Sequence, residues 1–511
     1  MKYQYLLANL PDYVEEVHKL SRHSVVRVSE EDLFDFVSYI YNHFQYQRLL
    51  DISFFKNQNE VTLWFMSLEE HDLIGVVCEL KSDEQNILAL NQLYLNFDSL
   101  AFSLNQSLGY ELIKNLDDYY QKFAPYTPKS SVLVKERDIR VRDIIRINNH
   151  LNKFGDMDIA ALSIDERVVE LDFQVNDCHN QIAKKLSNMP IQSTINHLLK
   201  VDGYNAPSVA IGFCMALEEH LQLDIPDKAK AVRMIFLEFS RILESIEYIS
   251  SLAYSIQAQY LYHKALFWLQ KLERILVYYT GNIYHLGLFS LGGIMKDIQS
   301  GWITYCNTHL REIQEEINSE FELLTSSSLW RDRLVIAPSN PDDLLKWGLS
   351  GNPLRSAGLN IDLRKRKPYY FYDEVIFDVP VALKGNVFDK LLLSFLDLEQ
   401  SFEIIFQVLD NIPTGPLVHP ACDMSKMIRE KSGFKLDDIL LDGYVFHSLE
   451  TFKGTLNFSM CIEDKKIKNL KVGNDNLSKL NYFKSYGVNQ RIADISLVYR
   501  SLNINSSMME L

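Results

Sequence analysis

The residues of this chain that could carry chemistry are scattered along it rather than gathered into a recognised catalytic motif. The 13 histidines include no HExxH pair, and neither a GxSxG turn nor a Walker A loop occurs. Gly292-Gly293 lacks the spacing of the GxGxxG loop that binds dinucleotides. The six cysteines form no CxxC pair, so we interpret them as small buried residues rather than ligands of iron–sulfur clusters. The sequence therefore predicts no metal site in this chain.

One tract is locally basic. Residues 135–142 read KERDIRVR, a mixture of signs that favours a solvated or subunit-facing segment over a polyanion site. The whole chain has 52 Lys and Arg against 67 Asp and Glu, a net charge of −15. A protein that neutralises a nucleic-acid backbone normally carries the opposite sign. We therefore expect no nucleic-acid partner.

The most specific stretch of the sequence is residues 348–381, which contains the runs GLSG, DLRK and FDVPV. Its charged members that we single out are Arg355, Asp362, Arg364, Asp373 and Asp378. In one interpretation the glycines serve turns, and Asp362, Arg364 and Asp373 form a buried salt-bridge network that only shapes the fold. The helices and strands predicted on either side of this block determine how its charged residues are positioned.

The first 125 residues are typical of a small α+β domain. Residues 29–32, Ser-Glu-Glu-Asp, resemble a capping box and predict a helix that runs to about His43. Residues 50–55 and 60–65 predict a strand hairpin, and residues 74–80 a third strand. Turn-forming residues then predict a linker over 126–145, and we assign 146–511 to a second domain.

The second domain is predicted to be mainly helical. Pro226-Asp227 fits a helix start with proline in the first turn, and the apolar positions after it indicate a wide buried face. Residues 258–279 and 302–324 predict two more long helices, and a bundle is the natural arrangement. Beyond it we predict a strand over 374–379 and a helix over 387–409. Three more strands are predicted over 444–446, 456–462 and 467–472, which gives an α+β fold class.

Composition places the chain among ordinary globular proteins. Of its 511 residues 47% are apolar and 23% are charged. No segment approaches the ~20 apolar residues that span a bilayer, and the first residues show no apolar core of a signal peptide. We therefore expect a cytoplasmic protein that reaches a membrane only through partners.

The block over 348–381 closely resembles the GFSG…LRGSG…WDLRK…YD…VEFDVPV block of the D-type subunit of respiratory complex I, which is related to the large subunit of nickel–iron hydrogenases. Further segments are similar to this family in the same order. They are residues 165–166, 179, 233–243, 292–297, 330–333, 385–401 and 493–503. The resemblance implies a hydrogenase-large-subunit-like bundle with small sheets over about 140–511.

The first domain is similar, in the order and spacing of its elements, to the C-type subunit of the same complex. Residues 49–52, the strand pair and residues 97–110 carry this resemblance. Many bacteria fuse the C-type and D-type chains in this order. The chain thus resembles such a fused C/D-type protein, with a small α/β sandwich domain in front of the bundle.

The departures from the family pattern concern the quinone site. Alignment places His150 to Gly155 on the family's HPAAHG and Lys200 to Gly203 on its RLDY. The quinone-facing His becomes Phe154 and the Tyr becomes Gly203, and neither side chain can donate a proton to a quinone oxygen.

Two nearby groups could still serve the reaction. The resemblance leaves Asp202 as the surviving acid of the cavity, and Tyr204 lies one residue from the lost Tyr and could replace it if the loop shifts. The two CxxC pairs of a nickel–iron centre are absent.

The resemblance implies a peripheral subunit on the cytoplasmic face of the cell membrane, in a complex I-like NADH:quinone oxidoreductase. Its implied partners are an iron–sulfur subunit and membrane-arm subunits, and its implied role is electron transfer to quinone coupled to ion translocation. The chain itself would bind no cofactor, since quinone is the substrate and the iron–sulfur cluster belongs to a partner. The alternative is a redox-inactive scaffold or coupling subunit, which the replacements at 154 and 203 favour.

Overall fold

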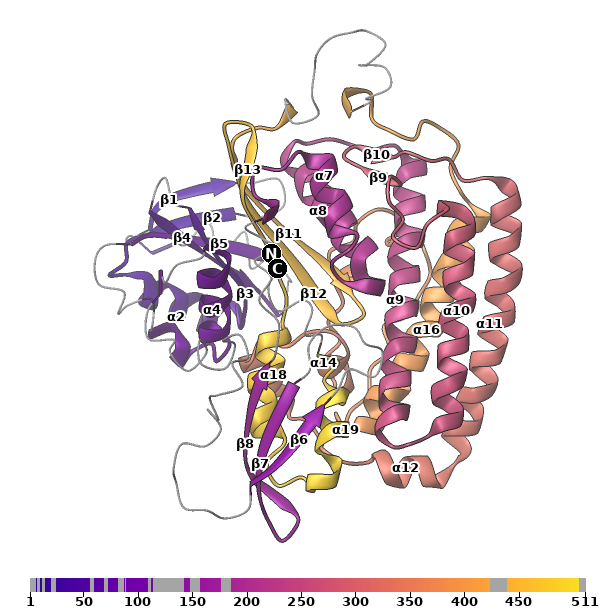
Figure 1. Cartoon of the computed structure of the whole chain (residues 1–511). Coiled ribbons are helices and arrows are strands. Elements are labelled where there is room, and N and C mark those ends of the chain that lie inside the picture. The colour runs from indigo at the N-terminus through magenta and orange to yellow at the C-terminus, as the bar shows by residue number, and fades with distance from the viewer. Residues whose placement is uncertain are drawn as a thin grey trace.

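The computed structural model describes residues 14–19, 24–55, 59–68, 72–80, 89–108, 142–147, 157–175, 185–422 and 439–504, together with Leu6, residues 10–11, Ile87 and residues 112–113. It contains a sheet-based N-terminal part and a mainly helical remainder, with a small sheet between them (Figure 1). This agrees with the predicted α+β class. Residues 126–141 of the expected linker lie outside the described residues, and residues 142–145 begin strand β6. The division into 1–125 and 146–511 stays a prediction.

The N-terminal part is built on a five-stranded sheet in the order β1-β2-β5-β4-β3. β2 and β5 are parallel and the other neighbours are antiparallel. The predicted hairpin and third strand are confirmed as β3, β4 and β5. The elements of this part are β1 (Val14–Lys19), β2 (Ser24–Val28), α2 (Leu33–Phe44), β3 (Arg48–Phe55), β4 (Glu60–Met66), β5 (Leu73–Glu79), η1 (Ala89–Gln92) and α4 (Phe97–Leu108).

The predicted start of helix α2 is confirmed, with the cap formed slightly differently. The Ser29 hydroxyl accepts a hydrogen bond from the backbone N–H of Asp32 and donates one to the Asp32 carboxylate. Five apolar residues of α2 are buried. A helix with one apolar face beside a sheet is the usual way to cover an α+β core.

Long helices lying side by side make the right-hand part of the molecule in Figure 1. The three predicted long helices are confirmed within one or two residues. α9 is buried along almost its whole length, because α8, α10, α16 and α19 pack around it. The elements are α7 (Ile191–Leu198), η2 (Gly203–Asn205), α8 (Ala206–His220), α9 (Asp227–Ser255), α10 (Gln259–Thr280), β9 (Phe289–Ser290), β10 (Gly293–Ile294), α11 (Ser300–Ser326), α12 (Ser328–Leu334), α13 (Pro341–Lys346), α14 (Asn352–Ser356), α15 (Leu363–Arg366) and α16 (Val387–Asp410).

A three-stranded antiparallel sheet stands between the N-terminal sheet and the bundle (Figure 1). The three predicted C-terminal strands are confirmed in longer form as β11 (Gly443–Thr451), β12 (Gly454–Glu463) and β13 (Lys466–Gly473). A second three-stranded sheet packs near the C-terminal helices. Its strands are β6 (Arg142–Ile147), β7 (Met157–Ile164) and β8 (Arg167–Val175), and the remaining elements are η3 (Pro420–Cys422), α18 (Asn476–Tyr486), η5 (Ile492–Asp494) and α19 (Ile495–Ser501).

The predicted strand over 374–379 is wrong. This segment runs beside α16, whose glutamine side chains take the place of a neighbouring strand. The Gln407 amide accepts from the N–H of Ile376 and donates to its carbonyl, and the Gln400 side chain accepts from the N–H of Asp378. Extended backbone needs hydrogen-bond partners, but these partners need not be another strand.

The described cysteines agree with their interpretation as buried residues. Cys78, Cys214, Cys306, Cys422 and Cys461 are free thiols and all are buried. Within the described residues, no helix is both long and apolar enough to cross a bilayer. Among the same residues, no group of three or more His, Cys, Asp or Glu side chains is arranged to hold a metal ion.

Candidate functional site

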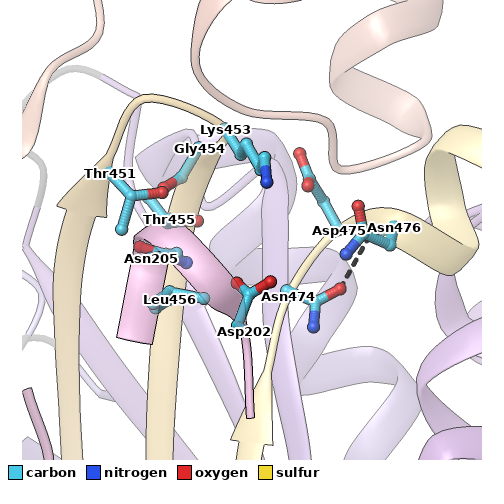
Figure 2. Close-up of a pocket in the computed structure, with 10 residues that line it drawn as sticks. All are labelled: Asp202, Asn205, Thr451, Lys453, Gly454, Thr455, Leu456, Asn474, Asp475 and Asn476. Atoms are coloured by element: carbon cyan, nitrogen blue, oxygen red, sulfur yellow. Dashed lines mark hydrogen bonds between the residues drawn. The ribbon is translucent and has the colours of Figure 1, made fainter. Parts of the chain in front are cut away.

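A small pocket lined mostly by polar residues opens where the start of η2 meets the turn between β11 and β12 (Figure 2). Its space is about that of one water molecule. Its walls come from the start of η2, the β11–β12 turn and the residues that lead into α18. The lining residues are Asp202, Asn205, Thr451, Lys453, Gly454, Thr455, Leu456, Asn474, Asp475 and Asn476. The pocket thus contains the predicted acid, Asp202, beside a cation that the sequence analysis did not single out, Lys453.

The β11–β12 turn is fixed tightly against the GLSG run. Gly454 has a φ of +125°, and a Cβ there would lie 2.0 Å from the Ser350 Oγ. Gly351, with a φ of +68°, packs directly against the Gly454 backbone. The Ser350 hydroxyl donates to Asp475 at 2.8 Å and accepts from the N–H of Thr455 at 2.9 Å. These glycines are needed because two backbones approach more closely than a side chain allows.

Lys453 extends from this turn toward helix α9. Its Nζ lies 3.2 Å from Oε1 of Glu244 and 3.8 Å from Oε2 of Glu247. Lys479 supports the turn, since its Nζ donates to the Lys453 carbonyl at 2.6 Å and pairs with Asp475 at 2.9 Å. The lysine at the pocket is therefore held in place by its backbone and oriented by carboxylates.

Burial and neighbouring charges shift the pKa values of both Lys453 and Glu244. Burial raises the pKa of Glu244 to about 7, and the neighbouring Lys453 only partly offsets that rise. Burial alone would lower the pKa of Lys453, but Glu244, Asp202 and Glu247 outweigh it and raise that pKa above its usual value. The lysine therefore stays charged, while Glu244 is poised to gain or lose a proton near neutral pH.

The two positions next to Asp202 differ from each other. Gly203 has a φ of +45°, a conformation that suits glycine, and it carries no side chain into the pocket. The Tyr204 hydroxyl donates to Oε1 of Glu273 on α10 at 2.8 Å. Burial and then Glu273 raise the pKa of Tyr204. Tyr204 does not line the pocket, so its role as a replacement proton donor stays a prediction.

The other two expected cavity positions, His150 and Phe154, lie outside the described residues. Asp202 is 5% exposed and lines the pocket, and its role as an acid of the quinone cavity stays a prediction.

Residues 348–381, which carry the resemblance and are called the signature block below, supply the arginines of a network of buried ion pairs. Arg364 contacts Asp362 at 2.8 Å and Glu238 of α9 at 3.1 Å. The Tyr372 hydroxyl also donates to Glu238, at 2.5 Å. Burial by itself would raise the pKa of Asp362, but Arg364 and the other guanidiniums nearby hold it below its usual value. Each of these carboxylates has a close guanidinium, as a buried ionised group requires.

A second buried ion pair of this block joins Arg355 to Asp397 through two hydrogen bonds. The Arg355 guanidinium donates to both oxygens of Asp397 on α16, at 2.6 and 2.7 Å, and both side chains are buried. Asp373 and Asp378 are exposed. The expectation that Asp373 belongs to the buried network is therefore wrong, because its segment turns outward. Asp378 has a backbone role through its N–H, which donates to Gln400.

Glu450 on β11 joins this network to the central sheet. Its carboxylate accepts from the N–H of Leu363 at 3.3 Å, and burial, followed by the charge of Asp362, raises its pKa to about 7. Arg241 of α9 lies near both acids, but none of its three guanidinium nitrogens has a hydrogen-bond partner within the described part of the chain. Its nearest carboxylate oxygen, on Glu238, is 3.7 Å away.

The N-terminal sheet contacts the β11–β13 sheet through polar groups. Lys471 donates to Asp51 of β3 at 2.6 Å, and both side chains are almost fully buried. The Ser459 hydroxyl donates to the other Asp51 oxygen at 2.9 Å, and Trp64 stacks on Phe446 with ring centres 4.1 Å apart. These contacts attach the N-terminal part to the sheet that also carries Lys453.

Lys453, Glu244 and Glu450 were not predicted from the sequence. One signal could have marked Glu244, because it is a charged residue on the apolar face of α9, together with Glu238 and Arg241. No comparable signal marks Lys453, which stands in an ordinary hairpin turn.

Comparisons with known proteins agree with the resemblance. The family model described as respiratory-chain NADH dehydrogenase, 49 Kd subunit, matches residues 269–510. The D-type subunit of NADH-quinone oxidoreductase from Wolbachia pipientis subsp. Culex pipiens is 30% identical over 277 residues, which are 52% of this chain and 70% of that protein. The D-type subunit from Carboxydothermus hydrogenoformans is 25% identical over 346 residues, or 66% of this chain and 90% of that protein.

A fused relative is also found. The C/D-type subunit of NADH-quinone oxidoreductase from Bdellovibrio bacteriovorus is 29% identical over 268 residues, which are 52% of this chain. The match spans 48% of that protein, about half its length. With this level of identity, and with the sheet-based part in front of the bundle, the chain belongs to the family of the 49-kDa, D-type subunit of respiratory-chain NADH dehydrogenase, as a divergent member of the fused C/D kind.

Proposed function

We propose that this chain is a peripheral-arm subunit of a complex I-like membrane-associated redox complex and takes part in electron transfer to quinone coupled to ion translocation. The observation that carries the proposal is family membership together with the ion-pair network of the family's signature block around Arg364. Because Arg364 and Arg355 both have their carboxylate partners in place, the block keeps the fold on which assembly with partner subunits would depend.

In this proposal the chain's own contribution to quinone chemistry comes from the pocket. A quinone oxygen that gains negative charge on reduction needs hydrogen-bond donors and a proton source. Lys453 is a charged donor at the pocket, and Asp202 is an acid beside it. Tyr204 would contribute only after its hydroxyl leaves Glu273.

The proposed partners follow from the family. An iron–sulfur subunit would deliver electrons, and membrane-arm subunits would hold the chain at the cytoplasmic face of the cell membrane. The chain would bind no cofactor of its own.

A second candidate function is favoured by specific observations at the same site. Gly203 has no donor, the Tyr204 hydroxyl is engaged by Glu273, and the pocket has space for about one water molecule rather than a quinone ring. In this alternative the chain is a redox-inactive scaffold or coupling subunit of a related complex.

The experiment is to purify the full-length chain from its native membrane by an affinity tag and to measure both its partners and quinone reductase activity. The proposal expects co-purified iron–sulfur and membrane subunits and an active complex. Asp202→Asn should then lower quinone reductase activity at least tenfold, about the effect of losing one proton-transfer group, without loss of subunits. Asp373→Asn, at an exposed position of the signature block, is the matched control and should change neither.

The outcomes separate the candidates. An assembled complex without quinone reductase activity, or with activity that Asp202→Asn leaves unchanged, supports the scaffold function. Recovery of the chain as a free monomer contradicts both.

A further inference from the structure

Lys453, which lines the pocket, lies among three carboxyl groups, while Asp475, another acid of the pocket, pairs with Lys479. Lys453, from the β11–β12 turn, faces Glu244 and Glu247 on successive turns of α9, and Asp202 from the start of η2. If all three acids were ionised, one positive charge would face three negative charges in a mostly buried space. Like charges this close cannot all remain ionised without a large cost, so one acid must hold a proton.

The three acids are not equally placed to hold that proton. The Glu244 side chain is fully buried, whereas one fifth of the Glu247 side chain is exposed. Within the described residues, the Lys453 ammonium, 3.2 Å from Oε1, is the one polar partner of the Glu244 carboxyl group. An ionised carboxylate with a single polar partner is costly to bury, whereas the neutral acid is much less so. The proton therefore belongs on Glu244.

Glu244 itself does not line the pocket, but Lys453, 3.2 Å from its carboxyl group, does. The Lys453 side chain is 16% exposed, and it lines the pocket together with Asp202 (Figure 2). The pocket has space for about one water molecule, which could pass a proton between Asp202 and the buried acid.

We propose that Glu244 is a proton-binding site that exchanges its proton with solvent through the water-sized pocket formed by Asp202 and Lys453. In the loaded state Glu244 is neutral and the Lys453 ammonium is balanced by Glu247 and Asp202. When the proton leaves through the pocket, Glu244 becomes a carboxylate and takes the ammonium as its counter-ion. Burial and the surrounding charges set this exchange near neutral pH, in agreement with the raised pKa of Glu244.

The test is a pH titration of the purified full-length chain by infrared spectroscopy, which detects the carbonyl band of a protonated buried carboxylic acid. Glu450 is a second buried acid whose pKa is raised to about 7, so the titration is done in a Glu450→Gln background. We expect one band that disappears with a midpoint near pH 7. Glu244→Gln should abolish it, and Glu247→Gln, three residues along the same helix and in contact with the same lysine, should retain it.

Two further variants test the charges that face Glu244, with opposite signs. Lys453→Met removes the cation and should raise the midpoint by about one pH unit or more. Asp202→Asn removes a negative charge and should lower it, and it should also slow the loss of the band after a jump to high pH.

A band that persists in the Glu244→Gln variant would overturn the proposal. If that variant does not fold, the Lys453 and Asp202 variants decide, because midpoints that do not move in opposite directions contradict it equally. The titration is measured on the chain itself, so the proton-binding site can stand even if the proposed redox function fails.

Discussion

Two buried clusters of charge lie close together in this molecule, and they are built in opposite ways. In the signature block the arginines have carboxylates in contact, as Arg355 has Asp397 and Arg364 has Asp362. At the pocket three acids share Lys453. Complete pairing fixes charges in place, whereas an excess of acids leaves a proton that can move.

Burial of charge alone therefore does not identify a functional site. Both clusters are buried and both contact α9. The network of the signature block explains how the family's most recognisable residues hold the bundle, the segment after α13 and the β11–β13 sheet together. A proton that can move is instead expected where acids outnumber cations, as they do around Lys453.

The largest expected effect comes from breaking a complete pair. Asp397→Ala leaves the Arg355 guanidinium buried without its partner and should reduce the free energy of unfolding by about 3–5 kcal/mol. Urea denaturation of the purified chain measures this. Asp378→Ala, at an exposed position of the signature block, should stay within about 0.5 kcal/mol of wild type. Equal effects of the two variants would contradict the structural role of the network.

The pH dependence of the free energy of unfolding tests the cluster of acids around Lys453, in which Glu244 is the buried acid with the raised pKa. The pKa of Glu244 rises from 4.5 to about 7 on folding, so the folded chain holds this proton more tightly than the unfolded chain. The contribution of this group to stability is therefore fully present below pH 4.5 and is lost as pH rises to 7, by about 3 kcal/mol. Glu244→Gln should remove that fall, so the difference in unfolding free energy between wild type and variant should change across this pH range. A constant difference would show that Glu244 does not titrate there.

A substitution in the β11–β12 turn, which carries Lys453, should reduce stability less than the loss of the Arg355–Asp397 pair. Gly454→Ala combines a φ of +125° with a clash against the Ser350 hydroxyl and should cost about 2 kcal/mol. Gly281→Ala, where φ is also positive but nothing lies within 4 Å of the added methyl, should cost about half as much. Thermal denaturation of both variants compares them. A smaller loss for Gly454→Ala than for Gly281→Ala would contradict the close approach of the two backbones.

The smallest expected effect concerns Tyr204. Tyr204→Phe removes the hydrogen bond to Glu273 and should lower stability by about 1 kcal/mol, without moving the infrared midpoint of Glu244. Tyr278→Phe, at a side chain that is 65% exposed, should leave stability unchanged. A shifted midpoint in Tyr204→Phe would mean that this tyrosine belongs to the pocket after all.

Much of the local structure could be predicted from the sequence. The helix beginning at Asp227 carries a wide apolar face and a proline before its first turn, and both signals act over a few residues. The strand predicted over 374–379 failed because alternation of apolar residues reports that one face is buried, not which group satisfies the backbone. There the partner is the pair of glutamines on α16.

The site was predictable only in part. The family resemblance singled out Asp202, which lines the small pocket, but its role in a quinone cavity stays a prediction. Lys453 and Glu244 were not found, since nothing local distinguishes a lysine in a hairpin turn that will face a buried helix from one that will face solvent. Tyr204 shows the converse, because it is close to Asp202 in sequence yet its hydroxyl bonds to a different helix.

The amino-acid sequence alone determined the family, the helices of the bundle and the presence of charges that a mostly apolar interior must accommodate. Those properties depend on the types of residues and on their separation over short stretches of the sequence. The tertiary structure alone decided which charges meet, and therefore that Arg355 and Arg364 are paired in the signature block while three acids share Lys453. Electrostatic energy depends on distances between groups that are remote along the chain, and only the packing of the two sheets and the bundle sets those distances.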